Sequence, residues 1–389
     1  MRGNAAALTS PGVRIVTDLA QIDPAAWDAL AGGQASLSHA YLATLESTGC
    51  VGGRTGWRAR HATLWQDGEL VAALPLYEKD HSWGEYVFDW AWADAYAQHG
   101  LAYYPKWLAA VPFTPIPGMR LLGKDVASRR TLLAAVLALA ATSGVSSVHV
   151  LFPGEDEAGW MRDAGLLLRH GVQFHWFNAG YADFASFLAC LNHPKRKKIQ
   201  QDRRHAAAHG LSYRWEDGAS ASAADWRFFY RCYGATYALH RATPYLTARF
   251  FTELARRAPR AVRLLLAERD GAPVASAFFL CDREALYGRY WGAVEYLPCV
   301  HFELCYYRAI EYCIAHDLAR FEGGAQGEHK LARGLQPVVT RSAHWLRDAR
   351  FRDAVDRFLA RETKGVGFYL DELAERSPFR RGPAEHPRG

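Results

Sequence analysis

A repeated strand pattern constrains the fold of this chain more than any other feature of its sequence. One segment, from Arg60, reads RHATLWQDGELVAALPLYEKDHSWGEYVFDWAW, and another, from Val262, reads VRLLLAERDGAPVASAFFLCDREALYGRYWGAV. In each, an apolar strand, an Asp-Gly turn, a second apolar strand and a charged turn precede an aromatic-rich third strand. The repetition predicts two copies of one antiparallel unit.

The turns and aromatic residues of the two copies occupy comparable places. Asp67-Gly68 and Asp270-Gly271 are typical two-residue hairpin turns, because both of their residues tolerate positive φ. Trp90–Trp92 follows the first hairpin as Tyr290 and Trp291 follow the second, so we expect both groups in third strands.

Each copy is followed by a predicted helix and a further strand. The first helix covers Ser128 to Thr142 and precedes the strand SVHVLF, and the second covers His301 to His316 and precedes RFEGG. A meander followed by a helix and a strand is an α+β arrangement. With 389 residues, the chain is too long for one ordinary core. We predict domains at 1–185 and 186–347 and a C-terminal helical segment and tail at 348–389.

Composition indicates a globular protein and says little about partners. Half of the residues are apolar and the formal net charge is +6, which permits a polyanionic partner without requiring one. The seven cysteines form no CxxC pair, which is typical of free thiols in a reducing compartment. The N-terminus lacks a long apolar segment, and no run reaches membrane-spanning length. We therefore expect a cytoplasmic protein without membrane insertion.

A basic segment lies between the two copies. HPKRKKIQQDRRHAAAHGL, from His193 to Leu211, predicts a helix that ends at Gly210. Its cations, which include Arg196, Lys197 and Lys198, fall within about three helical turns. Such a helix can bind the phosphates of a nucleotide or an RNA, or it can form a solvated surface.

The segment FEGGAQGEHKLARG, from Phe321 to Gly334, combines glycines with dense charge. It contains neither a Walker loop nor a dinucleotide fingerprint, because the glycine spacing is wrong for both. The glycines allow a tight turn at a strand end, and His329 is a plausible proton acceptor. The alternative is a charged surface loop. If the turn is functional, it would display a set of ionisable side chains together: Glu322, Glu328, His329, Lys330 and Arg333.

Two further groups of residues are candidates for a binding pocket. In FDWAWADAYAQHG, Asp89 and Asp94 lie among aromatic residues that include Trp90. This arrangement can line a pocket or simply pack at a strand end. His301 and Glu303 begin a predicted helix, where either can face a cleft or cap the helix. HExxH, GxSxG and EF-hand patterns and zinc-ligand spacings do not occur, so metal-dependent and triad hydrolase chemistry is not expected.

Several of these stretches resemble a known family. The chain is predicted to contain two tandem copies of one unit, in which antiparallel strands are followed by a helix and a further strand. This arrangement resembles the tandem acetyltransferase-like (GNAT) fold of the Fem aminoacyl transferases. SHAYLATLE, GEYVFDWAWADAY, YYPK, VPFTP and EGGAQGEHKLARG are similar to a FemAB-like family often described as peptidoglycan biosynthesis or recognition proteins. The resemblance extends from about Ser36 to Leu346, and it implies an α+β fold of two tandem GNAT-like domains with mainly antiparallel sheets.

The sequence departs from the Fem pattern at identifiable places. Ala332 stands where Fem enzymes carry a Lys before the Arg-Gly step, and Leu335 replaces an aromatic residue. The acetyl-CoA pyrophosphate loop is also missing. The corresponding segments read PIPGMR and YLPCVHF, and without a series of glycines the backbone cannot easily approach a pyrophosphate. The departures favour a donor other than acetyl-CoA.

The resemblance implies an acyltransferase in which an amine attacks an activated acyl donor. We expect a small-molecule or peptide amine as acceptor, aminoacyl-tRNA or acyl-CoA as donor, and no tightly bound cofactor or metal. A non-catalytic protein that binds a peptide or cell-wall fragment is the alternative, because fold does not imply activity. The sequence does not identify the donor, the acceptor, the domain that bears the cleft or the oligomeric state.

The same resemblance suggests a role for each candidate residue. Aminolysis requires a held amine, a proton acceptor and donors for the oxyanion. The expected proton acceptors are Glu322 and His329. The groups expected to bind substrate are Asp89, Trp90, Asp94, Lys330, Arg333 and His301, and those expected to bind donor phosphates are Arg196, Lys197 and Lys198.

Overall fold

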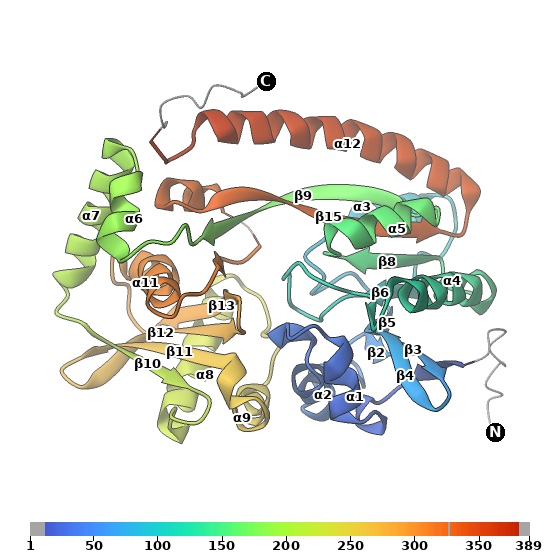
Figure 1. The fold of residues 1–389 in the computed structure, drawn as a ribbon, viewed down its shortest axis with the longest axis horizontal. Helices are drawn as coiled ribbons and strands as arrows, with labels where there is room; N and C mark the ends of the chain where they lie inside the picture. The colour runs from blue at the N-terminus through green and yellow to red at the C-terminus, as the bar shows by residue number, and fades with distance from the viewer. Residues whose placement is uncertain (1–11, 326, 381–389) are drawn as a thin grey trace. The chain divides into compact units, whose positions relative to one another are not determined.

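The computed structural model describes residues 12–325 and 327–380, which form two compact units (Figure 1). Unit 1 contains the described residues up to Gly171 together with Tyr245–Leu254 and Val339–Val366. Unit 2 contains Val172–Pro244, the described part of Ala255–Val338, and the described residues from Gly367 onward. Each unit is built from separated stretches of chain, and the domain boundaries at 185 and 347 stay a prediction.

Unit 1 contains two sheets. The first has the order β1-β3-β4-β7 and is antiparallel throughout. In the second, β15, β8, β6, β5 and β2 follow one another, and β6 and β8 are parallel. The strands are β1 (Val13–Val16), β2 (Trp57–Ala59), β3 (His61–Gln66), β4 (Glu69–Leu74), β5 (Leu76–Lys79), β6 (Lys106–Ala109), β7 (Leu122–Gly123), β8 (Ser147–Leu151) and β15 (Gln336–Leu346), of which β15 begins in unit 2.

Unit 2 is built on one sheet in which β10, β11, β12, β13, β14 and β9 follow one another. The neighbours are antiparallel except for β13 and β14, which are parallel. The strands are β9 (Leu167–Phe177, which begins in unit 1), β10 (Ser212–Asp217), β11 (Val262–Arg269), β12 (Ala272–Cys281), β13 (Ala285–Ala293) and β14 (Arg320–Glu322).

Helices cover these sheets within each unit. In unit 1, α4 packs on β3 and β4, and in unit 2, α8 packs on β12 and β13 (Figure 1). The helices are α1 (Pro24–Leu30), α2 (His39–Ser47), α3 (Trp90–Gln98), α4 (Val126–Ser143), α5 (Glu155–Asp163), α6 (Phe184–Cys190), α7 (His193–Ala207), α8 (Ala223–Leu239), α9 (Ala248–Arg257), α10 (Val300–Phe302), α11 (Arg308–Ala315) and α12 (Ala349–Glu375).

Both predicted hairpins are present. Asp67 and Gly68 have φ of 49° and 81°, and Asp270 and Gly271 have φ of 49° and 77°. These values are those that a tight two-residue hairpin needs at both turn positions. The helix predicted after the first copy matches α4, and the predicted C-terminal helix matches α12. The predicted basic helix matches α7, which ends at Ala207 rather than at Gly210. The helix predicted from His301 to His316 is divided into α10, an irregular turn at Glu303–Tyr307 and α11.

The prediction that Trp90–Trp92 forms a third strand is wrong, because these residues begin α3. The alternation of aromatic residues with alanine resembles a strand, but Trp92 and Tyr96 are four residues apart and both are buried. Alanine-rich sequence with that spacing favours a helix with one apolar face. The third strand of the first copy is instead β6, which starts at Lys106.

One helix of the described chain, α4, is long and apolar enough by length and composition to cross a membrane. A third of it is buried within the protein, and Leu132, Leu133 and Val136 belong to the core of unit 1. The core helix of a globular domain has these same properties.

In unit 2, β13 and α8 approach each other closely at a glycine. A Cβ added at Gly292 would lie 2.1 Å from the carbonyl oxygen of Cys232 in α8, whereas one added at Gly234 would meet nothing within 4 Å. The absence of a side chain at Gly292 therefore lets the helix backbone rest on the strand.

We expect opposite effects of two alanine substitutions in this region. Gly292→Ala should destabilise the protein by about 3 kcal/mol, because the helix backbone must move. Gly234→Ala should stabilise it by about 0.5–1 kcal/mol, because alanine favours the helix. Chemical denaturation measures both, and equal stability of the two variants would contradict the close packing of β13 and α8.

Candidate functional site

In unit 2, the two parallel strands separate and leave a cavity. β13 and β14 pair from Ala285 and Arg320 to Tyr287 and Glu322 and then diverge. The cavity has a volume of about 100 Å³, and Gly288, Gly323 and Gly324 form part of its wall. Its remaining lining consists of Ala277, Phe278, Phe279, Arg289, Tyr290, Trp291, His301, Cys305 and Tyr306.

A β-bulge places Arg289 at this cavity. Phe278 pairs with Tyr290 and Phe279 pairs with Gly288, so Arg289 is the extra residue on β13. Bulges bend a strand and redirect side chains, and they are frequent near active sites. The divergence of the strands thus has a local cause on the β13 side.

An irregular helix forms another wall of the cavity. Glu303–Tyr307 is a π-helical turn between α10 and α11, and it places Cys305 and Tyr306 on the cavity. Insertions of this kind are frequent at functional sites. His301 lies in α10 with its ring centroid 4.4 Å from that of Trp291. Burial, with help from nearby cations, lowers the pKa of His301 to about 4, so its imidazole is neutral at pH 7.

Behind this wall lies the short 3₁₀ helix η5 (Glu328–Arg333), where the sequence predicts an open charged loop. The Tyr306 hydroxyl and His329 Nε2 are 3.0 Å apart, and Lys330 Nζ donates to the Gly324 carbonyl at 2.9 Å. Lys330 is 2% exposed, and burial lowers its pKa to about 8. The prediction that this group is displayed together is wrong for three of its members, which are buried: Glu322, Lys330 and Arg333.

A buried carboxylate joins the basic helix α7 to this region. Asp202, which is 1% exposed, accepts from Tyr307 at 2.8 Å and from Arg333 at 3.1 Å. Lys198 forms an ion pair with Asp202 at 3.0 Å. Arg203, one residue along α7, pairs with Glu303 of the π-helical turn at 3.0 Å. One face of α7 is therefore fixed against the residues that surround the cavity.

Glu322 is buried beside the cavity rather than in its lining. Arg320 donates to it at 3.1 Å, and His175 Nε2 lies 3.9 Å from its other oxygen. Burial raises the pKa of Glu322 to about 7, which is suitable for a proton acceptor near neutral pH. Glu322 directly precedes Gly323, which belongs to the lining.

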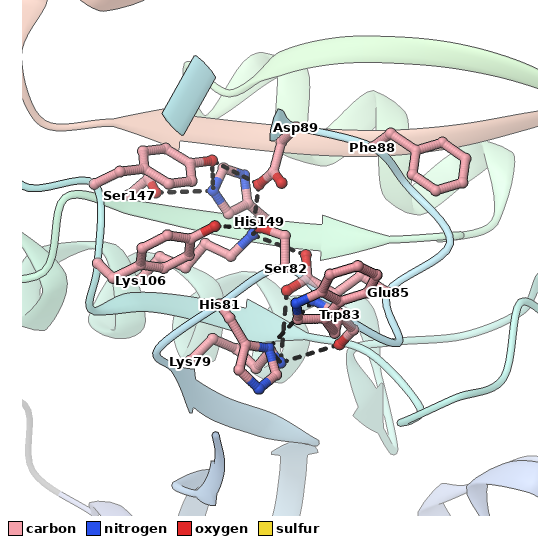
Figure 2. A network of polar contacts seen from close by, with 12 residues as sticks. Lys79, His81, Ser82, Trp83, Glu85, Phe88, Asp89, Lys106, Ser147 and His149 are labelled. Carbon is pink, nitrogen blue, oxygen red and sulfur yellow. Dashed lines mark hydrogen bonds and ion pairs between the residues drawn. The ribbon is translucent and has the colours of Figure 1, made fainter. Parts of the chain in front are cut away.

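Unit 1 holds a second concentration of buried charge, around Lys106 at the start of β6 (Figure 2). The Lys106 ammonium group donates to Asp89 at 2.5 Å and to Glu85 and Ser82 at 2.8 Å each. Lys106 is fully buried, and Asp89 and Glu85 are nearly so. Removing one partner of such a group leaves an uncompensated buried charge, so these ion pairs hold the loop before α3 in place.

The network continues into the second sheet of unit 1. Tyr103 donates to Asp89 at 2.6 Å and lies 3.0 Å from His149 Nε2. The Nδ1 atoms of His149 and His344 are 2.7 Å apart. Burial lowers the pKa of His149 to about 3 and the pKa of His344 well below its usual value, so both rings are neutral.

The parallel pair of unit 1 differs from that of unit 2 at its far end. Beyond β6 and β8 the chain forms a further bridge between Gly118 and Pro153. Arg120 is fully buried there and donates to the carbonyl groups of Leu151 at 2.7 Å and Ile116 at 2.6 Å. A side chain thus occupies the end of this pair, whereas the corresponding place in unit 2 is a cavity.

The structure brings together some of the residues predicted from the sequence. His301 lines the cavity of unit 2, and His329, Lys330 and Arg333 lie behind it. Glu322 lies beside it. Lys198 is bound to Asp202, while Lys197 is exposed and Arg196 half-buried on α7.

The remaining candidates belong to unit 1. Asp89 is part of the Lys106 network, Trp90 contacts Trp83 with ring centroids 5.0 Å apart, and Asp94 is exposed. The roles assigned to all these residues stay predictions.

Sequence reasoning missed several residues of both sites. No role is predicted from the sequence for three residues of these sites. Tyr306 lies in a predicted helix, Trp291 in a predicted strand and Asp202 in the predicted basic helix. Lys106 stands in the YYPK stretch, where no motif or spacing distinguishes it from a surface lysine. A lone acid within a strongly basic helix, as Asp202 is, was the one available signal, since buried acids are seldom unpaired.

Comparisons with known proteins identify the family of the chain and solved structures with a similar fold. The FemAB-like family, described as peptidoglycan biosynthesis/recognition, matches residues 18–381, and the chain belongs to this family. No match was found among curated protein sequences. Three solved structures are similar at 11% identity. One is the C-terminal domain of a protein described as a putative lysylphosphatidylglycerol synthetase from Agrobacterium fabrum, with a TM-score of 0.55 over 88% of this chain and 97% of that one. Another is L-PGS from Bacillus licheniformis, with a TM-score of 0.53 over 87% of this chain and 97% of that one. The third is FemX, with a TM-score of 0.50 over 82% of this chain and 93% of that one.

These comparisons confirm the predicted fold class and family. The chain belongs to the FemAB-like family, and it shares its fold with FemX and the two other solved structures. At 11% identity the structural similarities establish the fold alone, so donor and acceptor are matters for proposal.

We expect the buried histidine pair to make stability depend on pH. Because the folded-state pKa values are lowered, the unfolded chain binds more protons below pH 6.5, and folding stability falls as pH falls. His344→Gln should therefore reduce the loss of stability between pH 7.5 and pH 5 by about 2 kcal/mol. Denaturant titration at both pH values measures this loss.

The exposed His240 provides a matched control. His240→Gln should show the same loss of stability between pH 7.5 and pH 5 as the unsubstituted protein. If His344→Gln also keeps the full loss, the pair does not contribute to acid sensitivity.

Proposed function

We propose that the protein forms an amide bond in the cavity of unit 2, by transfer of an acyl group from an activated donor to an amine. The observation that carries this proposal is the cavity itself, at the point where β13 and β14 diverge. It is surrounded by groups that can move a proton: His301, Tyr306, His329 and Glu322. Glycine at 323 and 324 leaves backbone amides accessible to a carbonyl oxygen.

The chemistry requires two proton movements. The amine nitrogen bonds to the acyl carbon, the bond from that carbon to the donor oxygen breaks, and the amine proton passes to a base. Glu322 and His329 are the candidates for this base. Burial keeps the pKa of Tyr306 well above its usual value, so its hydroxyl stays protonated and can donate to the departing oxygen.

We further propose aminoacyl-tRNA as the donor. Lys195, Arg196 and Lys197 form no ion pair within the described chain, and α7 is held against the cavity region through Asp202. A cationic helix in this position can bind RNA phosphates. An acyl-CoA donor is the alternative. The segment before α10 contains no glycine, and Cys299 adopts φ of 67° there, which does not favour close approach of a pyrophosphate.

The proton acceptor can be identified from the pH dependence of transfer. Because the pKa of Glu322 is raised to about 7, it is ionised and able to accept a proton only above that pH. Transfer should therefore rise with pH through about 7. Glu322→Gln should lower the rate by roughly 10²-fold and abolish this rise. The measurement is single-turnover amide formation with one amine at several pH values.

Glu328 supplies a control, because it is a neighbouring glutamate outside the cavity lining. Glu328→Gln should keep the rate and its pH profile. His329→Gln tests the other candidate base. Retention of the full rate in both Glu322→Gln and His329→Gln would exclude this loop from catalysis.

The donor can be identified by RNA binding in a salt titration. Binding of bulk charged tRNA should weaken steeply with salt. The double substitution Arg196→Glu and Lys197→Glu should make the slope of log binding constant against log salt concentration shallower. The change should be about 0.7–0.9 for each phosphate that the helix no longer neutralises. Lys364→Glu, at an exposed position of α12, changes the charge as much as either single substitution in α7 and should leave the slope unchanged.

Coenzyme A distinguishes the alternatives in the same experiment. Competition between coenzyme A and tRNA, or binding of coenzyme A without RNA binding, would replace the tRNA donor with an acyl-CoA. Binding of neither would favour a non-catalytic protein that recognises a peptide or cell-wall fragment.

A further inference from the structure

A large apolar groove lies between α3 and α12 within unit 1, and Trp92 in its lining also contacts His344 of the buried network, with ring centroids 4.9 Å apart. Its volume is about 350 Å³, compared with about 100 Å³ for the cavity of unit 2. Alanines from both helices, Ala91, Ala95 and Ala354, line it. Small side chains on facing helices leave space that the two backbones cannot fill. The volume lies in the range of small-molecule pockets.

The floor of the groove is aromatic and rigidly packed. Trp92 and Phe351 line it and are both buried, and the ring centroids of Phe351 and Tyr96 lie 4.0 Å apart. These residues belong to a core cluster of unit 1, so the groove has a fixed base. Val355 and Phe358 extend the apolar surface along α12.

The groove is polar at one end only. His99, just after the last turn of α3, contacts Phe351 in the first turn of α12 with ring centroids 5.4 Å apart. Arg350 lies at the same end, whereas Phe358 lies two turns further along α12. The described residues that line the groove include neither an aspartate nor a glutamate. The groove therefore has an apolar body and a basic end.

Arg350 is available to a ligand at that end. Its side chain is 79% exposed, and its partner is Asp348 at 2.7 Å. The pair is bidentate, through Nε at 3.1 Å and Nη2 at 2.7 Å, so a second anion would contact the exposed Nη1 side of the guanidinium group.

From these features we infer that the groove binds a single-chain anionic amphiphile, a molecule with a hydrocarbon chain and a carboxylate or phosphate head. The chain lies along the alanine-lined body on Trp92 and Phe351, and the head lies beside Arg350 and His99. This site belongs to unit 1 and does not depend on the transfer reaction proposed for unit 2.

Isothermal titration of the full chain with dodecanoate, below its micellar concentration, tests the inference. One molecule should bind per chain. Ala354→Trp should weaken binding at least tenfold, because the indole fills the groove from an exposed position that tolerates the substitution. Ala360→Trp, on the same helix but outside the lining, should leave binding unchanged.

The basic end is tested separately. Arg350→Gln should weaken binding of dodecanoate several-fold, and dodecyltrimethylammonium should bind more weakly than dodecanoate. Unchanged binding in Ala354→Trp, equal binding of the two amphiphiles, or absence of binding would each overturn the inference. Binding only to vesicles of anionic phospholipid would overturn it in favour of a membrane-contacting face. Self-association abolished by Ala354→Trp would overturn it in favour of a contact between copies of the chain.

Discussion

Two parallel strands that pair over three residues and then separate create the cavity of unit 2, where we propose that acyl transfer takes place. Beyond Tyr287 and Glu322, β13 and β14 no longer pair, and the space between them is bounded by glycine backbone, a bulged Arg289 and a π-helical turn. Each of these is a local irregularity, and together they surround one small cavity. The titratable residues behind the wall are positioned by the same irregularities, since η5 follows soon after the Gly323-Gly324 turn.

Unit 1 uses the same strand arrangement for a different purpose. β6 and β8 are parallel like β13 and β14, but Arg120 donates to the carbonyl groups at the far end of the pair. The buried charges of unit 1 lie instead at the near end, where Lys106 holds two carboxylates. The two units thus carry a cavity at one parallel pair and a buried ionic network at the other.

The fold was largely predictable from the sequence, whereas the sites were only partly so. Asp-Gly turns and apolar periodicity are local signals, and both hairpins and the long helices followed from them. The strand prediction for Trp90–Trp92 is wrong because alternating aromatic residues and alanines are compatible with both a strand and a helix. Only the burial of Trp92 together with Tyr96 distinguishes the two. Lys330 looked like a surface lysine in a charged loop, because nothing local to it reveals that the chain turns it inward to Gly324. Asp202, Tyr306 and Tyr307 reach their partners through tertiary contacts that the sequence does not encode locally.

The buried chain from Asp89 to His344 favours one direction of hydrogen-bond donation. The carboxylate of Asp89 can only accept, so the single Tyr103 hydroxyl proton points toward it. The contact between the Tyr103 oxygen and His149 Nε2 is then a hydrogen bond when Nε2 carries the proton, which the Ser147 hydroxyl oxygen, 2.8 Å away, can also accept. His149 then has an unprotonated Nδ1, which obliges His344 to carry its own proton on Nδ1 and to accept from Ser342 through Nε2. In this arrangement one ionised acid sets the tautomers of two histidines in the neighbouring strands β8 and β15.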